Sequence, residues 1–507
     1  MLLFNLILTI LFHSYLALYP ISIECFIILF SILWCLFFNL KNHLLRSYSK
    51  AEMILLFLSY LLIRLIYLFS DNMIDDDFYR YLWDGKMINE NFTPYVEPPI
   101  FYFNGDQKIS EKWDIILSNI NHPHLPTIYL PVAQMLFFLS VYFFDNNIYG
   151  LKFILFTIEF ILFIFLFIKS TSKNSETRTA YRNQYKNIWR EGLFWLVLSP
   201  IFVFHFSHEI HIDILGILFL VLAYSLLIEI FFSLDETSSS IVKYIYVTVF
   251  SLLYVLSIFT KPFGLIIFPF IFIIFKIKKV AISFIVSFTI SFVILFYPMI
   301  ESKSNLTSVN DFYSNFEYNS SLFSILNLIL KREIAEFIHI FIFAILYFII
   351  FLKWNNKIRI NKKSFKIGNS IFVLIPFSTI FAYLLLFGPI ANPWYLCWVI
   401  PFLGMEKYKS INIVNKYTHK KNKSLSWIEV WLITIMLAYI TPVYLQNTSS
   451  YFLNLFIEEK DAYSHNLYLQ IIQFFPVYIY IFFSKINFSI IKSKSIPIRS
   501  NLINQDK

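Results

Sequence analysis

Residues 74–95 read IDDDFYRYLWDGKMINENFTPY, and we expect the fold to be organised around this acidic and aromatic stretch. It directly follows an apolar segment in a chain that otherwise carries few charges. A helix that begins near Asp75 would place four side chains on one face, namely those of Asp77, Arg80, Tyr81 and Asp84. A carboxylate beside a guanidinium at a membrane surface can take part in acid–base chemistry. The alternative is that the three aspartates only mark the outward end of a membrane span and cap a helix.

The composition indicates a polytopic helical membrane protein. Hydrophobic residues make up 58% of the 507 residues and charged residues only 14%, and the mean hydropathy is +0.65. Most of the chain must therefore lie in lipid or in contacts between helices. The formal net charge is +9, but the basic residues occupy short loops between apolar spans. Basic residues in such loops set the orientation in which a membrane protein inserts, so they do not indicate an anionic partner. We therefore expect membrane lipids around the protein and no nucleic-acid partner.

The cysteines and the amino terminus add two expectations. Cys25, Cys35 and Cys397 lie in or beside apolar segments at no metal-ligand spacing, so we expect packing roles and no disulfide framework. The first residues lack a basic region, so Leu2–Leu18 is expected to be a retained helix and not a cleaved signal peptide.

Apolar spans and basic loops predict an all-α polytopic transmembrane bundle of about 14 helices with both termini inside. The spans are expected near residues 2–18, 22–40, 53–70, 149–168, 192–206, 213–233, 242–259, 263–277, 280–299, 335–353, 370–388, 391–405, 425–443 and 466–484. No repeat with a fixed period is visible, so a solenoid is not expected.

The segment 71–149 is expected to lie outside the membrane, because it carries eleven acidic and four basic residues. It should therefore form a long first external loop with juxtamembrane helices. Pro131–Phe144 is short for a bilayer, so we expect a half-buried or re-entrant helix that does not cross. Arg64 lies inside the span 53–70, and we favour outward snorkelling of its side chain over pairing with a carboxylate.

Four further polar groups fall at predicted outer turns. Residues 208–213 read HEIHID, but the i, i+3 spacing of the two histidines specifies a metal poorly, so no metal is expected. Residues 260–264 read TKPFG, and the alternative to a functional role for this lysine is that it snorkels to the membrane surface. Residues 316–323 read FEYNSSLF, and the alternative to a functional role is an amphipathic surface turn. Residues 389–395 read PIANPWY, and the alternative to a functional role is an interfacial aromatic belt.

Together these motifs resemble the GT-C class of membrane glycosyltransferases, and within it the bacterial polyprenyl-phosphate-mannose-dependent mannosyltransferases. The resemblance runs in order over residues 53–405 and is carried by DFYRYLWDG at 77–85, TPY at 93–95, TIYLP at 127–131 with Gln134, HID at 211–213, KP at 261–262, NSS at 319–321 and NPWY at 392–395. Thr93 and Ile212 stand where the family often has asparagine, and two extra helices precede the first family span. These departures concern the acceptor and the sugar more than the reaction.

The resemblance implies an inverting hexosyltransferase that passes a hexose from a polyprenyl phosphate to a lipid-linked or cell-envelope glycan. Mannose is the leading candidate for this hexose. It implies the bacterial inner (cytoplasmic) membrane, with the active site on the non-cytoplasmic side. It also implies an extra N-terminal hairpin at 1–50, a GT-C-like catalytic module at 51–405 with external loops 71–148 and 301–333, and C-terminal helices with a basic tail at 406–507. The donor is a lipid-linked sugar, and no metal or other cofactor is expected.

The acceptor hydroxyl needs a base as it attacks, and the resemblance implies Asp77 in this role. Asp76 is the close competitor, because a run of three aspartates cannot be aligned by eye. The departing lipid phosphate develops negative charge, for which Arg80, His211 and Lys261 are the candidate partners.

The other matching positions are implied to bind substrate or to hold the residues that do. Asp213 would orient His211 or bind a sugar hydroxyl, and Asp84 would hold Arg80 in place. Two aromatic rings could stack on a sugar or on the isoprenoid, and polar side chains could bond the phosphate or the sugar. These remaining candidates are Tyr95, Tyr129, Gln134, Asn319, Asn392, Trp394 and Tyr395.

Two other classes of protein stay open. A transporter or flippase of lipid-linked sugars would also have many helices, but it should carry charges near the bilayer midplane and show repeats. An outer-leaflet glycan polymerase or ligase would share the location but should use arginine and histidine without a carboxylate directly after a span.

Overall fold

A computed structural model of the chain describes residues 2–19, 22–44, 49–71, 74–103, 111–171, 179–232, 240–302, 304, 307–363, 375–405, 425–441 and 467–493. The described chain is helical, and its only extended pairing is an isolated parallel bridge between Tyr318 and Ile390. The prediction of an all-α protein is therefore confirmed for this part of the chain. Cys25, Cys35 and Cys397 are free thiols. Cys397 is buried, which fits the expected packing role, whereas Cys25 and Cys35 are exposed on the protein surface, so that expectation is wrong for these two.

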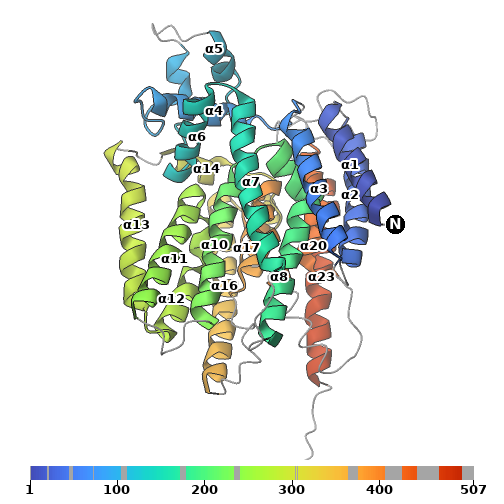
Figure 1. The fold of residues 1–507 in the computed structure, drawn as a ribbon. Helices are drawn as coiled ribbons and strands as arrows, with labels where there is room; N and C mark the ends of the chain where they lie inside the picture. The colour runs from blue at the N-terminus through green and yellow to red at the C-terminus, as the bar shows by residue number, and fades with distance from the viewer. Residues whose placement is uncertain are drawn as a thin grey trace, which may run out of the picture.

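Figure 1 shows how the helices of the described residues are arranged. Those of the first half are α1 (Leu2–Leu18), α2 (Ile23–Leu44), α3 (Lys50–Leu68), α4 (Asp77–Asn89), η1 (Pro99–Tyr102), α5 (Glu111–Ser118), α6 (Pro131–Phe144), α7 (Ile148–Thr171), α8 (Thr179–Leu198), α9 (Pro200–Val203), the π-helical turn η2 (Phe204–His208), α10 (Asp213–Phe232) and α11 (Ser240–Thr260). Those of the second half are η3 (Pro262–Ile267), α12 (Phe268–Ile277), α13 (Ala281–Glu301), α14 (Thr307–Asn315), α15 (Leu322–Ile329), α16 (Arg332–Lys363), α17 (Phe377–Phe387), α18 (Pro393–Leu396), η5 (Cys397–Phe402), α20 (Trp427–Thr434), η6 (Ile435–Tyr439) and α23 (Leu467–Ser493).

Seven helices within the described residues are long and apolar enough to cross a membrane. They are Ile23–Leu44, Lys50–Leu68, Ile148–Thr171, Asp213–Ile230, Ile241–Thr260, Ala281–Glu301 and Arg332–Asn356. Three of the other predicted spans, near 192–206, 263–277 and 391–405, are divided into shorter segments, because Pro200, Pro262 and Pro393 each begin a new segment within an apolar run. Long apolar helices are thus present, while a count of about 14 crossings stays a prediction.

A small helical cap covers one end of the bundle and carries the acidic stretch (Figure 1). It consists of α4, α5 and α6, and α4 and α5 share a small apolar core around Trp83 and Trp113. Helices α4 and α6 approach closely at Gly85, where a Cβ atom would lie 2.3 Å from the carbonyl oxygen of Phe137. Helix α6 has the bounds predicted for the short helix Pro131–Phe144.

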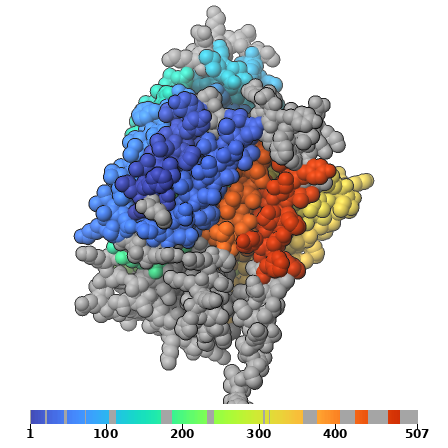
Figure 2. All heavy atoms as spheres, turned by 90° about the vertical axis from the view of Figure 1, so that its right-hand side faces the viewer, coloured from blue at the N-terminus to red at the C-terminus, as the bar shows by residue number. Residues whose placement is uncertain are grey.

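The first and the last described helices pack into the same apolar core as the middle of the chain. The ring of Phe26 on α2 lies 5.1 Å from Phe204 and 6.0 Å from Tyr439, measured between centroids. Figure 2 shows the N-terminal helices in blue beside the C-terminal helices in orange and red on one face of the molecule. The N-terminal hairpin and the helix that ends at Tyr439 therefore help to shape the interior next to the acidic stretch.

Arg64 is buried in the bundle and paired, so the interpretation that it snorkels outward is wrong. Its side chain is fully buried, and its Nε and Nη2 atoms donate to Glu159 Oε1 at 2.9 and 2.7 Å. The guanidinium also donates to the carbonyl oxygens of Leu196 and Val197. An arginine with these partners inside the protein needs no contact with the membrane surface.

Glu159→Gln should strongly destabilise the fold, because it leaves the Arg64 charge buried without its counter-ion. Breaking a buried pair from one side costs about 3–5 kcal/mol, whereas replacing both partners by apolar residues is far milder. Thermal unfolding in detergent should therefore show a large drop in melting temperature for Glu159→Gln and recovery in Arg64→Leu/Glu159→Leu. Glu229→Gln, at the part-exposed Lys169–Glu229 pair, is the matched control and should change little. A Glu159→Gln variant that melts with the wild type would contradict this account.

Candidate functional site

The acidic loop between α3 and α4 is fastened to the bundle by Glu209. The backbone N–H groups of Ile74 and Asp75 donate to Glu209 Oε2 at 2.9 and 2.7 Å. Glu209 is itself buried and contacts the Nδ1 atom of His208. The carboxylate therefore sets the position of the backbone from which the three aspartates project.

An irregular turn brings two histidines together below this loop. Pro200 starts α9, which passes into the π-helical turn η2, and Ile210 then adopts a left-handed conformation with φ 52°. A β-branched residue in this region is strained, so the surrounding contacts must hold it there. The backbone N–H of His211 donates to the carbonyl oxygen of His205, and the centroids of the two imidazoles lie 5.6 Å apart.

His211 forms a hydrogen bond with Asp75 and lies beside Asp77. Nε2 lies 3.1 Å from Asp75 Oδ2, and Nδ1 lies 3.7 Å from Asp77 Oδ2. The ring stacks on Trp394 with a centroid distance of 3.9 Å and an interplanar angle of 16°. Burial by itself lowers the pKa of His211, but the hydrogen bond and charge of Asp75, with the charge of Asp77, raise that pKa overall.

The three aspartates differ in exposure and in partners. Asp75 is buried and also accepts a hydrogen bond from the Tyr439 hydroxyl at 3.0 Å. Asp77 keeps 30% of its side chain exposed and accepts a hydrogen bond from Tyr81 at 3.3 Å. Burial raises the pKa of Asp77, and the charge of His211 offsets part of this. Burial, with the charges of Asp77 and Asp75, raises the pKa of Asp76 to about 6.

Lys261 and Asp213 form a second charged pair beside the aspartates. Lys261 Nζ lies 2.7 Å from Asp213 Oδ2, and the indole N–H of Trp398 donates to Asp213 Oδ1 at 2.6 Å. The ammonium lies 4.3 Å from the ring centroid of Tyr395. Within the described part of the chain, Asp213 contacts Lys261 and Trp398 directly and acts on His211 only through its charge.

The residues that directly precede the NSS and NPWY motifs are joined by backbone hydrogen bonds. Tyr318 N–H donates to the carbonyl oxygen of Pro389 and Ala391 N–H donates to that of Tyr318, both at 3.0 Å. Asn319, in a left-handed conformation with φ 51°, donates from Nδ2 to the Ala391 carbonyl at 3.0 Å. Asn392 occupies the residue position before α18, without a capping hydrogen bond from its side chain, and α18 carries the two aromatic rings of the site. Asn319 thus holds the strand-like segment that positions Trp394 and Tyr395.

Arg80, Asp84 and Gln134 form a separate buried network between α4 and α6. Arg80 Nε donates to Asp84 Oδ1 and Gln134 Nε2 donates to Asp84 Oδ2, both at 2.8 Å. The expected contact of Asp84 with Arg80 is therefore present, and Asp84 is fully buried. Tyr95 is buried near Asp84, and its hydroxyl has no hydrogen-bond partner among the described residues. Tyr129 lies outside this network. Its ring packs edge-on against Tyr81, whose hydroxyl donates to Asp77.

Sequence reasoning missed three residues that contact this site. Tyr439 lies beyond residue 405, where the family resemblance ends, so no motif pointed to it. His205 lies outside the quoted HEIHID motif, and only the π-helical turn brings it to His211. Glu209 stood inside that motif without a role. The position of Glu209 between two histidines was the signal that could have identified it.

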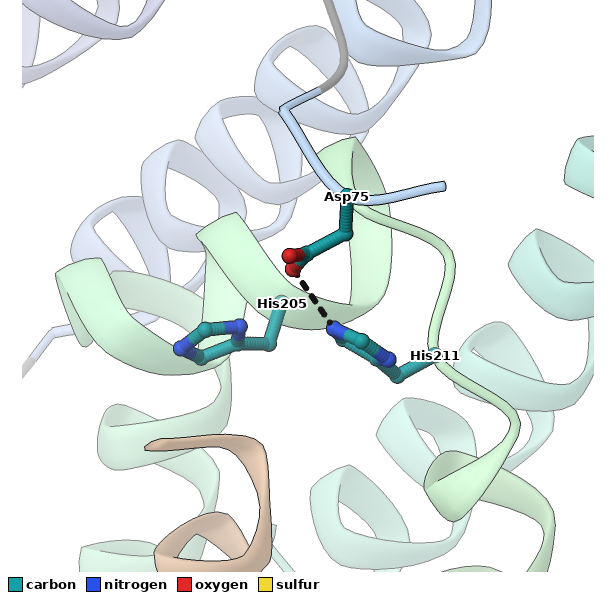
Figure 3. A group of neighbouring side chains, drawn as sticks. All are labelled: Asp75, His205 and His211. Carbon is teal, nitrogen blue, oxygen red and sulfur yellow. Dashed lines mark hydrogen bonds and ion pairs between the residues drawn. The ribbon is translucent and has the colours of Figure 1, made fainter. Parts of the chain in front are cut away.

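Asp75, His205 and His211 could hold a metal ion. Each offers one ligand atom, and these atoms lie within 4.8 Å of one another (Figure 3). All three residues are buried. Two imidazoles and one carboxylate are donors that zinc and related transition metals accept.

Glu209→Ala should loosen the acidic loop, because it removes the acceptor of two backbone N–H groups. Hydrogen bonds to a charged group are worth about 1.5–3 kcal/mol, so amide exchange at Ile74 and Asp75 should accelerate at least ~10-fold. Hydrogen exchange with mass spectrometry on the detergent-solubilised protein measures this. Glu90→Ala, at an exposed glutamate of the same cap, is the control and should leave the loop unchanged. Unaltered exchange in Glu209→Ala would show that the loop is held by other contacts.

The arrangement can perform acid–base chemistry next to a cationic group. Asp77 is accessible and can accept a proton, while Lys261 and His211 can stabilise negative charge that develops nearby. Trp394 and Tyr395 present aromatic surfaces beside these charges. Comparison of the chain with protein-family models, with curated proteins and with solved structures found no match.

Proposed function

We propose that this protein is an inverting membrane hexosyltransferase that uses a polyprenyl-phosphate sugar as donor. Mannose is the leading candidate for the sugar, and the acceptor is a hydroxyl of a lipid-linked or cell-envelope glycan. One observation carries the proposal: Asp75–Asp77, His211, Lys261 and the NPWY rings come from distant parts of the chain and lie around one point. Motifs that matched the family by chance would have no reason to converge.

Asp77 is the general base in this proposal. Its carboxylate accepts the proton of the acceptor hydroxyl while that oxygen bonds to the anomeric carbon on the face opposite the phosphate. The bond from the anomeric carbon to the phosphate oxygen breaks, and the polyprenyl phosphate leaves with the electron pair. Asp77 suits this role better than Asp75, because Asp77 is partly exposed whereas Asp75 is buried and already accepts two hydrogen bonds.

The cationic groups serve the leaving phosphate. Lys261 is held by Asp213 at 2.7 Å and by the face of Tyr395, so its ammonium is fixed before the substrate arrives. It is also close enough to Asp77 for its charge to lower the pKa of that carboxyl. A monophosphate leaving group carries less charge than a diphosphate, so residues of the chain can stabilise it and the reacting step uses no metal.

The position of the charged loops supports an active site on the non-cytoplasmic side. The acidic cap with α4 and α6 lies at one end of the molecule, and the turn between α12 and α13 lies at the other (Figure 1). That turn carries Lys276, Lys278 and Lys279. Basic loops stay on the cytoplasmic side during insertion, so the aspartates would face the opposite side of the bacterial inner membrane.

Asp77→Asn should abolish sugar transfer while donor binding is retained. General bases contribute roughly 100-fold or more, so the rate of transfer from a labelled polyprenyl-phosphate mannose in membranes should fall by at least that factor. Asp76→Asn and Asp75→Asn are measured in parallel, because the largest loss of transfer identifies the base. Asp114→Asn, an exposed carboxylate on α5, is the control and should transfer normally.

Two outcomes would contradict the proposal. Transfer that survives in Asp77→Asn and Asp76→Asn alike would leave the reaction without its base. Movement of the labelled lipid across the bilayer, with no glycan product in the wild type, would favour a transporter of lipid-linked sugars.

A further inference from the structure

We propose that Asp75, His205 and His211 form a binding site for a divalent transition-metal ion, with zinc as the best match. The ion would join the acidic loop before α4 to the irregular turn before α10. The spacing of His208 and His211 argues against a metal, but the second histidine of this cluster is His205, which η2 turns toward the loop.

The geometry of the three donors fits a small ion with modest adjustment. Their ligand atoms lie within 4.8 Å of one another, and Asp75 Oδ2 and His211 Nε2 are only 3.1 Å apart. In Figure 3 the carboxylate of Asp75 and a ring nitrogen of each histidine face a common space. Zinc binds such atoms at about 2.0–2.2 Å, which places neighbouring ligands roughly 3–3.5 Å apart. Side-chain movements of about an ångström would therefore close the site.

The residues around the donors are those that usually support a metal site. A histidine that binds a metal typically turns its other ring nitrogen to a carboxylate, and His211 Nδ1 lies 3.7 Å from Asp77 Oδ2. Trp394 stacks on the same imidazole and limits its rotation. The backbone of Asp75 is fastened by Glu209. Both features reduce the freedom that ligands lose when an ion binds.

Tyr439 offers a fourth polar atom at the same place. Its hydroxyl lies 3.0 Å from Asp75 Oδ2 and 3.4 Å from His205 Nδ1, so it touches two of the three proposed ligands. A phenol there could donate to a metal-bound carboxylate, and a water molecule would complete the four positions that zinc prefers.

Charge and donor type select the class of ion. Four carboxylates gather at the loop and the turn, on Asp75, Asp76, Asp77 and Glu209, and a dication would offset part of this charge. Two imidazoles disfavour magnesium and calcium, which prefer oxygen ligands throughout. The ion would occupy the place of the proton that His211 Nε2 now shares with Asp75, and it would hold the loop without entering the reacting step.

Cobalt is the probe, because tetrahedral Co²⁺ reports its ligands through its visible absorption and Zn²⁺ displaces it. We expect the chelator-treated, detergent-solubilised full chain to bind one equivalent of Co²⁺ with this absorption and to melt at a higher temperature when Zn²⁺ is added. His205→Phe, His211→Phe and Asp75→Asn should each remove the absorption. His43→Phe, at an exposed histidine paired with Glu52, is the matched control and should retain it.

The measurement needs no sugar donor, so its result is independent of the proposed transfer reaction. A wild type that binds no Co²⁺ would overturn the site, and so would His205→Phe with an unchanged cobalt spectrum. Size-exclusion profiles verify that each variant is folded. Where a variant does not fold, X-ray absorption of the cobalt-loaded wild type decides, because the site requires two imidazole ligands and their absence would exclude it.

Discussion

The structure depends on how one buried carboxylate is satisfied. Asp75 lies at the end of an apolar helical bundle, and a carboxylate without partners there would be very costly. His211 and Tyr439 supply the contacts to its side chain, and Glu209 accepts its backbone N–H. These partners come from the turn before α10 and from the C-terminal helices, so the acidic loop can be placed only when distant parts of the chain have already packed.

Breaks in the helices place most of the remaining groups. Pro200 starts the short α9 that leads into η2 and His205, Pro262 directly follows Lys261, and Pro393 directly precedes Trp394. Proline is favoured in the first turn of a helix, so each one starts a new helical segment beside a polar or aromatic side chain. In a helical membrane protein such irregular backbone is tolerated where other parts of the protein bury it. Uninterrupted helices would be simpler to insert but would not turn these side chains toward one point.

Local features of the sequence predicted the helices and much of the site, and tertiary contacts supplied the rest. The bounds of α1 and α6 agree with the apolar runs, because length, hydrophobicity and an initial proline are all local properties. Motifs along the chain likewise pointed to Asp77, His211 and Lys261. The partner of Arg64 is 95 residues away, and that of Asp75 on η6 is 364 residues away, so neither periodicity nor spacing could identify them.

The aspartate run shows why position within a motif does not decide function. Asp75 is the most buried of the three, and its carboxylate already contacts His211 and Tyr439, so it is poorly placed to meet a substrate hydroxyl. Asp77 is more exposed and faces the second nitrogen of the same imidazole. One histidine can therefore hold the loop through Asp75 and lie beside Asp77, the carboxylate proposed as the base. These two roles require two carboxylates at a fixed separation. Asp75 and Asp77 provide them, because they lie two residues apart where the loop enters α4.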